Sequence, residues 1–485
     1  MRPRMTRLRF GLTLIALVVG CDAERHLIGD TRDGATEVGP SGTGGGAGSL
    51  DGGTGGTAPL GGTGGALGSG GSSGTGAGLG TGGGLGTAGT GGAPNTNARA
   101  LPHGGRVAVT SLARLLWQTA PDAALLAMAD SGAVSTTEDL RQLALRMLTD
   151  DRAQSGVGAF FRWWLDLDAI AAVTKDPAWF PQFNAALATA MASEPETFGV
   201  SVTLDGDGLF STLLTAPYTF MNDALAGVYG IDGITGTALR RVALDPTLRQ
   251  GLLTQPGFMA LNAHLNETAP TERGRFVLNK FLCTNVPAPP ASEGMPVVRS
   301  PTNPATTRSL VTAATSSAVC VSCHRIMDSV GFGFEHYDAI GSYRSSELGL
   351  PIDTTGAVTV LASGNATFDG APQLAGILAV APEARDCISR MWVEYAIGRA
   401  LTTEDVAAVT DAERWFAAAG YNLRDLIAGG VQTDLFLTTP PICTPGSDLT
   451  CNTNPAQTSA SGHCTETARC TCTNGAPLAA TGHCP

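Results

Sequence analysis

Apolar residues recur at helical spacing through the first folded part of the chain. Leu112, Leu115 and Leu116 are three or four positions apart, which places them on one helix face. Pro121 is a favoured first-turn residue and predicts the start of a second helix. The pattern predicts an α-helical bundle up to about residue 200. Its first two helices are expected over residues 111–117 and after Pro121. The next two are expected from Ser135-Thr136-Thr137-Glu138 onward and over residues 152–166. The aromatic run Phe160-Phe161-Arg162-Trp163-Trp164 of the last helix is expected in the core.

The next part alternates helices with one short strand. The stretch from Tyr218 to Gly230 is amphipathic and ends in a glycine, which predicts a helix. Residues 239–244 predict a strand, and residues 250–264 predict a helix interrupted near Pro256. A further helix is expected over residues 271–283. Its pattern places Glu272, Arg273, Arg275 and Lys280 outside and Phe276, Leu278, Phe281 and Leu282 inside.

The last folded part returns to helical spacing. Residues 351–367 alternate weakly, as in a β-hairpin. Helices are expected over residues 306–318, 374–380, 386–398, 403–419 and 422–428. The predicted fold class is therefore mainly α, with helical bundle-like modules and a small β-hairpin. The expected boundaries are 105–235 for the N-terminal helical module, 240–346 for the second module and 350–435 for the C-terminal helical module.

Both ends of the chain differ from this body in composition. Residues 41–92 are nearly all Gly, Ser, Thr and Ala with occasional Leu, so residues 22–104 are expected to form a disordered tether. The tail, residues 436–485, carries six cysteines in a polar stretch without an apolar core. This composition is typical of a small module that disulfides hold together.

The first 21 residues have the layout of a lipoprotein signal peptide. Four arginines precede an apolar stretch from Phe10 to Val19, which is too short for a resident transmembrane helix. The stretch ends in Gly20-Cys21, a small residue before a cysteine, and resembles a bacterial lipobox. We therefore expect export, lipidation of Cys21 and anchoring to the cell envelope, at the outer membrane or cell surface. An ordinary signal peptide that contains a cysteine is the alternative.

Charge and motifs exclude several function classes. The net charge is −12, and no basic cluster lies outside the N-terminus. Because phosphate binding needs a Lys/Arg footprint, nucleic acid is not an expected partner. Outside the Gly-rich stretch, where Gly70–Gly74 matches by composition, the sequence contains no G-x-S-x-G, and it contains no H-E-x-x-H and no P-loop. This disfavours the hydrolase classes that use these motifs.

The candidate chemistry lies in Cys320-Val321-Ser322-Cys323-His324, a C-x-x-C-H motif. In c-type haem attachment, two thiols add to the porphyrin vinyl groups and the adjacent histidine ligates the iron. One helical turn would bring Cys320 and Cys323 to the same side. The motif therefore predicts haem c held by Cys320, Cys323 and His324. A plain disulfide and half of a metal site are the alternatives.

The number of cysteines is compatible with this interpretation. Of eleven cysteines, Cys21 is assigned to lipid, and Cys320 and Cys323 to haem. Six of the other eight lie in the tail. The remaining two, Cys283 and Cys387, lie on predicted helices that flank the motif and are expected to form a disulfide. The count is equally even if Cys320 and Cys323 bond to each other.

A haem iron also needs a ligand opposite His324. Met327 is only three residues further on, so local geometry disfavours it. His336 and Met391 are better candidates, and an open or water-bound position is the alternative. Without a ligand role, Met391 is most simply a core residue of its helix, and His336 a surface or hydrogen-bonded histidine.

Several short runs occur together in one kind of bacterial exported protein. They are Leu115-Leu116-Trp117, Pro121-Asp122, Leu125-Leu126, Arg146-Met147-Leu148, residues 249–255, Asn262-Ala263-His264, residues 271–278, the C-x-x-C-H motif with Met327-Asp328 and Gly331-Phe332, residues 337–341, and residues 395–399. As a set they resemble the Planctomycete-cytochrome-associated domains of unknown function, over roughly residues 105–435. The resemblance implies a c-type haem or redox role. Family members often carry proline after Met-Asp, where this chain has Ser329.

Two functional hypotheses follow. In the first, a surface-anchored, mostly α-helical lipoprotein binds one c-type haem and transfers electrons with a redox partner protein; an oxidoreductase component is one form of this role. In the second, Cys320 and Cys323 form a structural disulfide, and a non-catalytic surface protein binds a polymer or another protein. A histidine directly after the second cysteine favours the first hypothesis, because a disulfide does not need it.

Overall fold

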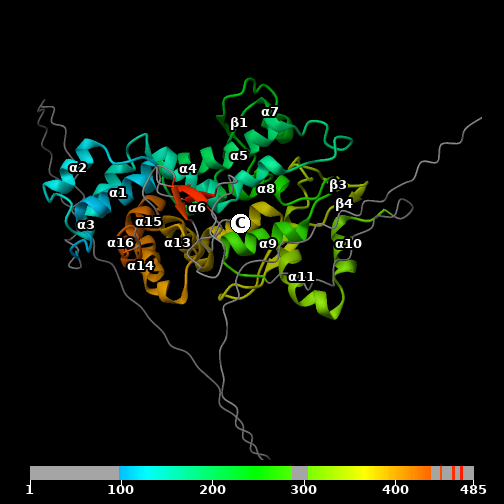
Figure 1. Ribbon diagram of the computed structural model, residues 1–485. Coiled ribbons are helices and arrows are strands. Elements are labelled where there is room, and N and C mark those ends of the chain that lie inside the picture. Colours follow the sequence, from blue (N-terminus) through cyan, green and yellow to red (C-terminus); the bar gives the residue numbers. More distant parts are fainter. Residues whose placement is uncertain (1–97, 287–303, 439–447, 451–460, 465–469, 473–485) are drawn as a thin grey trace, which may run out of the picture. The chain divides into compact units, whose positions relative to one another are not determined.

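The computed structural model describes residues 98–286 and 304–438, together with three short strands of the tail (Figure 1). The signal peptide with Cys21 and the tether up to residue 97 lie outside the described residues. So does most of the Cys-rich tail, apart from the antiparallel strands β7 (Asp448–Thr450), β8 (Ser461–Cys464) and β9 (Cys470–Cys472). None of the described helices is long and apolar enough to cross a membrane.

The described body is mainly helical, which confirms the predicted fold class. Its first helices are α1 (Gly104–Trp117), α2 (Ala123–Asp130), α3 (Thr137–Met147), α4 (Ala153–Trp164), α5 (Ala185–Val200), α6 (Phe210–Thr215) and α7 (Asp223–Tyr229). The central ones are α8 (Pro256–Leu261), α9 (Pro270–Phe281), α10 (Thr307–Ala314) and α11 (Ala318–Gly331). The last ones are α12 (Ala371–Val380), α13 (Pro382–Ile397), α14 (Val406–Ala418), α15 (Leu423–Gly430) and α16 (Asp434–Thr438).

Short segments connect these helices. The 3₁₀ segments are η1 (Leu167–Ala172), η3 (Leu252–Thr254), η4 (Phe332–Phe334) and η5 (Thr403–Asp405), and η2 (Ser201–Asp205) is a π-helical turn. Three antiparallel strand pairs are β1 (Tyr218–Met221) with β2 (Arg240–Ala243), β3 (Ser346–Glu347) with β4 (Leu350–Pro351), and β5 (Thr355–Val358) with β6 (Ala366–Asp369). The last pair is the hairpin expected within residues 351–367.

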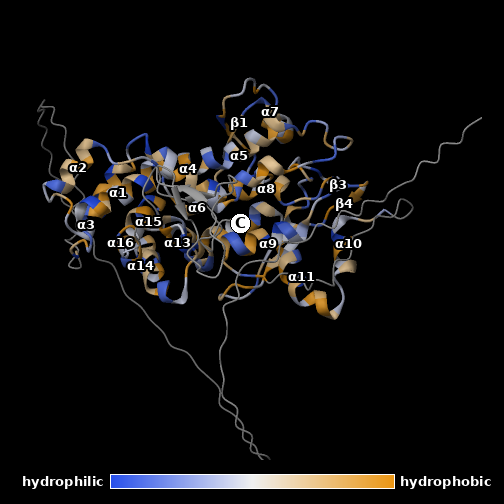
Figure 2. Cartoon of the chain, in the orientation of Figure 1, coloured by the Kyte–Doolittle hydropathy of each residue, from blue (hydrophilic) through white to orange (hydrophobic). Residues whose placement is uncertain are grey.

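Helix starts follow the local sequence closely. Thr136 caps α3: its hydroxyl accepts from the Asp139 backbone N–H, and the Asp139 carboxylate accepts from the Thr136 N–H. Asp122 caps α2 through the Leu125 N–H. Most of the buried residues on these helices are apolar, and Figure 2 shows hydrophobic and hydrophilic residues interspersed along them.

The stretch from Tyr218 to Gly230 is not one helix, as its amphipathic pattern predicted. Its first four residues form β1, which pairs with β2, and the helix α7 begins only at Asp223. Asn222 accounts for the break, because its side chain accepts from the Leu225 N–H and so caps α7. The partner strand lies about 20 residues away along the chain, so pairing overrode the helical periodicity.

The predicted core role of the α4 aromatic residues is confirmed for three of four rings. Phe160, Phe161 and Trp164 are buried, whereas Trp163 is 37% exposed. The Phe160 ring lies 5.2 Å from that of Trp392 and 5.4 Å from that of Tyr395, both on α13. Through such contacts one hydrophobic cluster extends from α1 to α16. The N-terminal and C-terminal helices therefore share a core.

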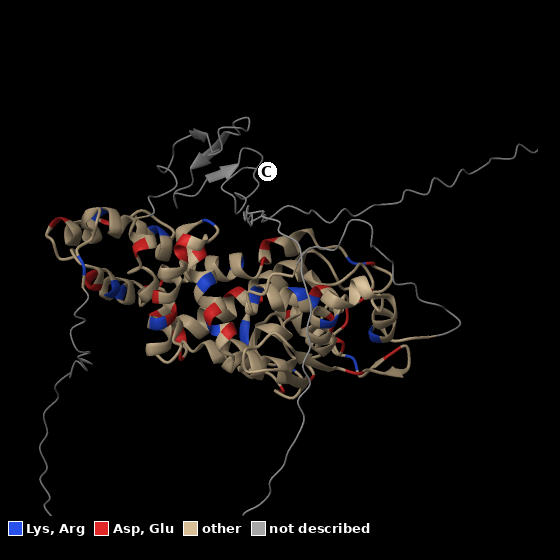
Figure 3. Ribbon diagram, turned by 90° about the horizontal axis from the view of Figure 1, so that it is seen from below, with Lys and Arg blue, Asp and Glu red and all other residues tan. Residues whose placement is uncertain are grey.

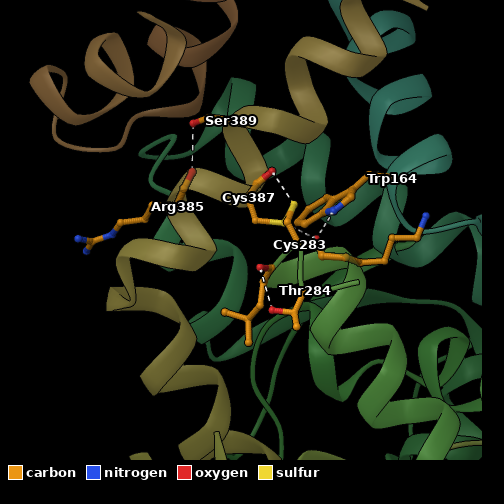
Figure 4. The surroundings of a disulfide bond; sticks show 8 residues. Trp164, Cys283, Thr284, Arg385, Cys387 and Ser389 are labelled. Atoms are coloured by element: carbon orange, nitrogen blue, oxygen red, sulfur yellow. Dashed lines mark hydrogen bonds between the residues drawn. A yellow bond between two sulfur atoms is a disulfide. The ribbon is translucent and has the colours of Figure 1, made fainter. Parts of the chain in front are cut away.

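A disulfide joins Cys283, just after α9, to Cys387 on α13, as expected from the sequence (Figure 4). Trp164 of α4 lies beside it and donates from its indole N–H to the Lys280 carbonyl. The bond links positions 104 residues apart. Closing a loop of that length in the unfolded chain stabilises the fold by up to about 5 kcal/mol in the chain-entropy account.

Glu194 is a fully buried carboxyl on α5. Its Oε1 accepts hydrogen bonds from Thr219 of β1, at 2.5 Å, and from the Tyr229 hydroxyl of α7. Burial raises the pKa of Glu194 to about 7, although these hydrogen bonds and the charge of Arg249 oppose the shift. The ordinary pKa of a glutamate carboxyl, which applies in the unfolded chain, is 4.5. The folded protein therefore holds the Glu194 proton more tightly than the unfolded chain does.

Glu194→Gln should remove a pH dependence of stability. Between pH 4.5 and about 7 the folded state binds more protons than the unfolded state, so the Glu194 contribution to stability declines as pH rises through this window. The decline amounts to about 3 kcal/mol and is complete above the folded pKa. Glutamine keeps an acceptor for Thr219 and Tyr229 but does not ionise.

Urea unfolding at pH 4.5, 6, 7 and 8 measures this difference. The variant should match wild type at pH 4.5 and be the more stable protein at pH 8. Glu272→Gln, which neutralises an exposed carboxylate on α9, is the charge-matched control and should follow wild type within about 0.5 kcal/mol. Parallel stability curves for wild type and Glu194→Gln would contradict the prediction.

Candidate functional site: the C-x-x-C-H helix

The C-x-x-C-H motif lies in the first two turns of α11. Ser317 caps the helix, and its hydroxyl accepts from the Cys320 N–H at 3.3 Å. Cys320 and Cys323 are one turn apart and partly exposed, and their sulfur atoms are not bonded to each other. Val319 and Val321, beside them, are 59% and 42% exposed. The start of α11 therefore carries two partly exposed cysteines with exposed apolar side chains beside them.

His324 is held by a carboxylate one turn further along α11. Its Nδ1 lies 3.2 Å from both Oδ1 and Oδ2 of Asp328. The His324 side chain is 24% exposed and that of Asp328 only 6%. Because Nδ1 faces the carboxylate, Nε2 is the ring nitrogen left to meet a ligand or metal.

Asp328 is fixed by two further elements. Thr271 of α9 donates to its Oδ1 at 2.6 Å, and Thr315, between α10 and α11, donates to its Oδ2 at 3.3 Å. Burial raises the pKa of Asp328, and the hydrogen bonds from Thr271, His324 and Thr315 oppose this shift. The carboxylate therefore connects His324 to α9 and to the start of α11.

The sequence analysis assigned neither Asp328 nor Thr271 a role at the site, although both lie in the runs that carry the family resemblance. The H-x-x-x-D spacing was a usable signal, because residues four apart meet on a helix. No local pattern marks Thr271, since its partner lies 57 residues away.

Helices α9 and α11 approach so closely that only glycine fits at two contact points. A Cβ on Gly274 would lie 1.9 Å from the Met327 carbonyl oxygen, and one on Gly331 would lie 1.8 Å from that of Pro270. Real Cβ atoms do not approach a backbone oxygen so closely, so the helices would have to separate. The close contact places Thr271 within reach of Asp328.

Arg273 lies in the same interface, although the charge pattern predicted it outside. Its side chain is fully buried, and it donates to the carbonyl oxygens of Phe334, Tyr337 and Asp338 at 2.6–3.0 Å. The prediction was wrong because these carbonyls, from the turn after α11, take the place of water around the guanidinium. Arg273 thus ties α9 to the turn that follows the motif helix.

Ser329, which follows Met327-Asp328, lies inside α11. Its hydroxyl accepts from the Ala357 N–H of β5 at 2.9 Å, and Gly356 packs against its carbonyl oxygen. The serine therefore connects α11 to the β5–β6 hairpin, and the helix continues past it to Gly331.

The two candidate axial ligands, His336 and Met391, have contacts of their own in the structure. His336 follows η4, where its Nδ1 lies 2.9 Å from the Arg344 carbonyl oxygen and its ring stacks on Tyr343. It lines a cleft of about 450 Å³ with Tyr343 and Asp369. Met391 lies on α13 and packs against the hydrophobic core, while α13 itself packs on α9, α14 and α15. Nothing in these contacts brings either side chain to His324.

Charges around the described body are mixed. In the view of Figure 3, acidic and basic residues are interspersed along the helices. Several form local pairs, such as Arg162 with Asp168 and Arg399 with Asp405. No group of three or more His, Cys, Asp or Glu side chains with metal-binding geometry occurs among the described residues.

Three protein-family models match the chain in succession. They are the proteins of unknown function DUF1592 over residues 107–231, DUF1588 over residues 249–347 and DUF1585 over residues 364–436. The chain belongs to the family of Planctomycete-cytochrome-associated domain proteins. The resemblance inferred from the short sequence runs is thereby confirmed. No curated protein and no solved structure matches the chain.

The DUF1588 domain contains the whole of the α9–α11 interface. Thr271, Arg273 and Gly274 on α9 and the motif helix itself all lie between residues 249 and 347. The contacts that hold His324 and Asp328 in place therefore belong to a single domain of the family.

Gly331→Ala should separate α9 from α11 and destabilise the protein. The backbone of Gly331 is helical, with φ −66° and ψ −33°, so the substitution adds no backbone strain and its cost comes from the clash with Pro270. We expect a loss of about 3 kcal/mol or more in urea unfolding.

Gly227→Ala is the matched control. Gly227 lies in α7, where an added Cβ meets no atom within 4 Å. Alanine should stabilise that helix by about 0.5–1 kcal/mol. Equal stability of wild type and Gly331→Ala would show that the close approach of the two helices is not needed.

Proposed function

We propose that this protein is an exported, lipid-anchored c-type haem protein that transfers electrons. Cys320 and Cys323 would hold the haem through thioether bonds, and His324 would ligate its iron. The observation that carries the proposal is the contact between His324 Nδ1 and the buried Asp328, which leaves Nε2 for a metal. Histidine ligands in proteins almost always donate their other ring N–H to such a partner.

The residues present fit a covalently bound haem. The two cysteines lie one turn apart on one side of α11, at a partly exposed surface. The exposed side chains of Val319 and Val321 offer apolar contact to a porphyrin. Bound there, haem would supply one-electron chemistry, while the chain would hold it, fix the ligand orientation and set its potential. We assign the sixth iron position to neither His336 nor Met391.

The test is expression in a host with haem-maturation machinery. Wild-type protein should stain for haem on a denaturing gel, because thioether bonds survive denaturation. Cys320→Ala should lose most of that stain, since it removes one of the two bonds and impairs attachment. Ser322→Ala, which changes an exposed hydroxyl between the two cysteines, is the matched control and should keep the stain.

Mass spectrometry of the peptide covering residues 311–344 decides the alternative. A haem adduct adds hundreds of daltons to this peptide, whereas a Cys320–Cys323 disulfide removes two hydrogen atoms. Colourless protein with this disulfide would overturn the proposal and favour a non-catalytic surface protein that binds a polymer or another protein.

Anchoring through Cys21 is the second part of the proposal, and it rests on the lipobox-like end of the signal peptide. Wild-type protein should sediment with membranes and incorporate labelled fatty acid. Cys21→Ser should lose the label and leave the membrane fraction, because lipid chains would provide the attachment. Equal membrane association of both proteins would contradict a lipid anchor.

A further inference from the structure

The geometry points to Asp328 as a positioning residue that increases electron donation from His324 and so lowers the reduction potential of the bound haem. This inference rests on the proposed haem-binding function. It concerns a residue outside the C-x-x-C-H motif. It assigns the motif helix a role in setting the reduction potential of the haem iron as well as in binding the haem.

The first argument is the geometry of the contact. His324 Nδ1 is equidistant, at 3.2 Å, from both carboxylate oxygens of Asp328. Residues four apart on a helix meet naturally, so the pair needs no distortion of α11. The Nδ1–H donates to the carboxylate, which fixes the tautomer in which Nε2 carries the lone pair.

The second argument is that Asp328 cannot easily turn away. Thr271 of α9 donates to Oδ1, and Thr315, between α10 and α11, donates to Oδ2. The Asp328 side chain is 6% exposed, so water does not compete strongly for its charge. A hydrogen bond to a buried anion is stronger than one to an exposed or neutral acceptor.

The effect on iron follows from charge. A carboxylate that accepts the Nδ1–H draws that proton toward itself and leaves more electron density on the imidazole ring. A more basic ligand stabilises ferric over ferrous iron, because the oxidised ion carries the higher charge. Reduction adds one electron to the iron and breaks no bond, so the shift appears directly in the midpoint potential.

Two variants should move the potential in opposite directions. Asp328→Asn keeps the size of the side chain but removes its charge, so the potential should rise. Thr271→Val removes a hydrogen bond that neutralises part of that charge, so the carboxylate should attract the His324 proton more strongly and the potential should fall. General damage to the site would move both variants the same way.

Asp353→Asn is the charge-matched control. Asp353 pairs with Arg308 of α10 and is 56% exposed. Its neutralisation changes the net charge as Asp328→Asn does but leaves the His324 contact intact, so the potential should stay at the wild-type value. Spectroelectrochemical titration measures all four proteins, and the haem-to-protein ratio verifies equal loading.

The outcomes separate this inference from the proposed function. Protein that takes up no haem overturns both. Haem-loaded protein in which Asp328→Asn leaves the potential unchanged, or in which both variants shift it in the same direction, overturns the role of Asp328 alone.

A measurement on wild type covers the case in which Asp328→Asn does not fold. The ¹⁵N shifts of His324 in protein prepared without haem report its tautomer, and the inference requires the proton on Nδ1. A proton on Nε2 instead would overturn the assignment without any substitution.

Discussion

The close contact between α9 and α11 is the constraint on which the candidate site depends. Gly274 and Gly331 let the two backbones approach until each would-be Cβ position is occupied by a carbonyl oxygen of the other helix. At that separation Thr271 reaches Asp328, and Arg273 reaches the carbonyls of Phe334 and Tyr337. A larger residue at either glycine would push the helices apart at these contacts, because a close-packed interior has no space for the added group.

The α9–α11 interface also contains buried charged side chains that balance one another. Arg273 is fully buried, and its charge is balanced by backbone carbonyl oxygens and by Glu335 at 3.9 Å. Glu335 in turn accepts from Thr268 and pairs with Arg344. Burial lowers the pKa of Arg273 to about 10, which still leaves the guanidinium charged at neutral pH. The buried guanidinium therefore favours the observed turn after α11, whose carbonyl oxygens of Phe334, Tyr337 and Asp338 accept from it.

The three family domains do not form three separate cores. Rings on α4 of DUF1592 pack against rings on α13 of DUF1585, and the Cys283–Cys387 disulfide joins DUF1588 to DUF1585 beside them. The motif helix lies outside this centre, with its first turns partly exposed and its last turn buried. The buried end of α11 therefore anchors its partly exposed beginning.

The sequence by itself determined the elements whose signals are local. Apolar periodicity located most helices, Thr136 and Asp122 marked helix starts, the alternating stretch became the β5–β6 hairpin, and the cysteine count singled out Cys283 and Cys387. Only the tertiary structure decided features that depend on distant partners. Tyr218 to Met221 became a strand because Arg240 to Ala243 pair with it, and Arg273 went inside because the turn after α11 supplies acceptors for its N–H groups. Asp328 lies at the site because Thr271, 57 residues earlier, holds it there. In each case the free energy comes from groups that are far apart along the chain, and no local pattern records it.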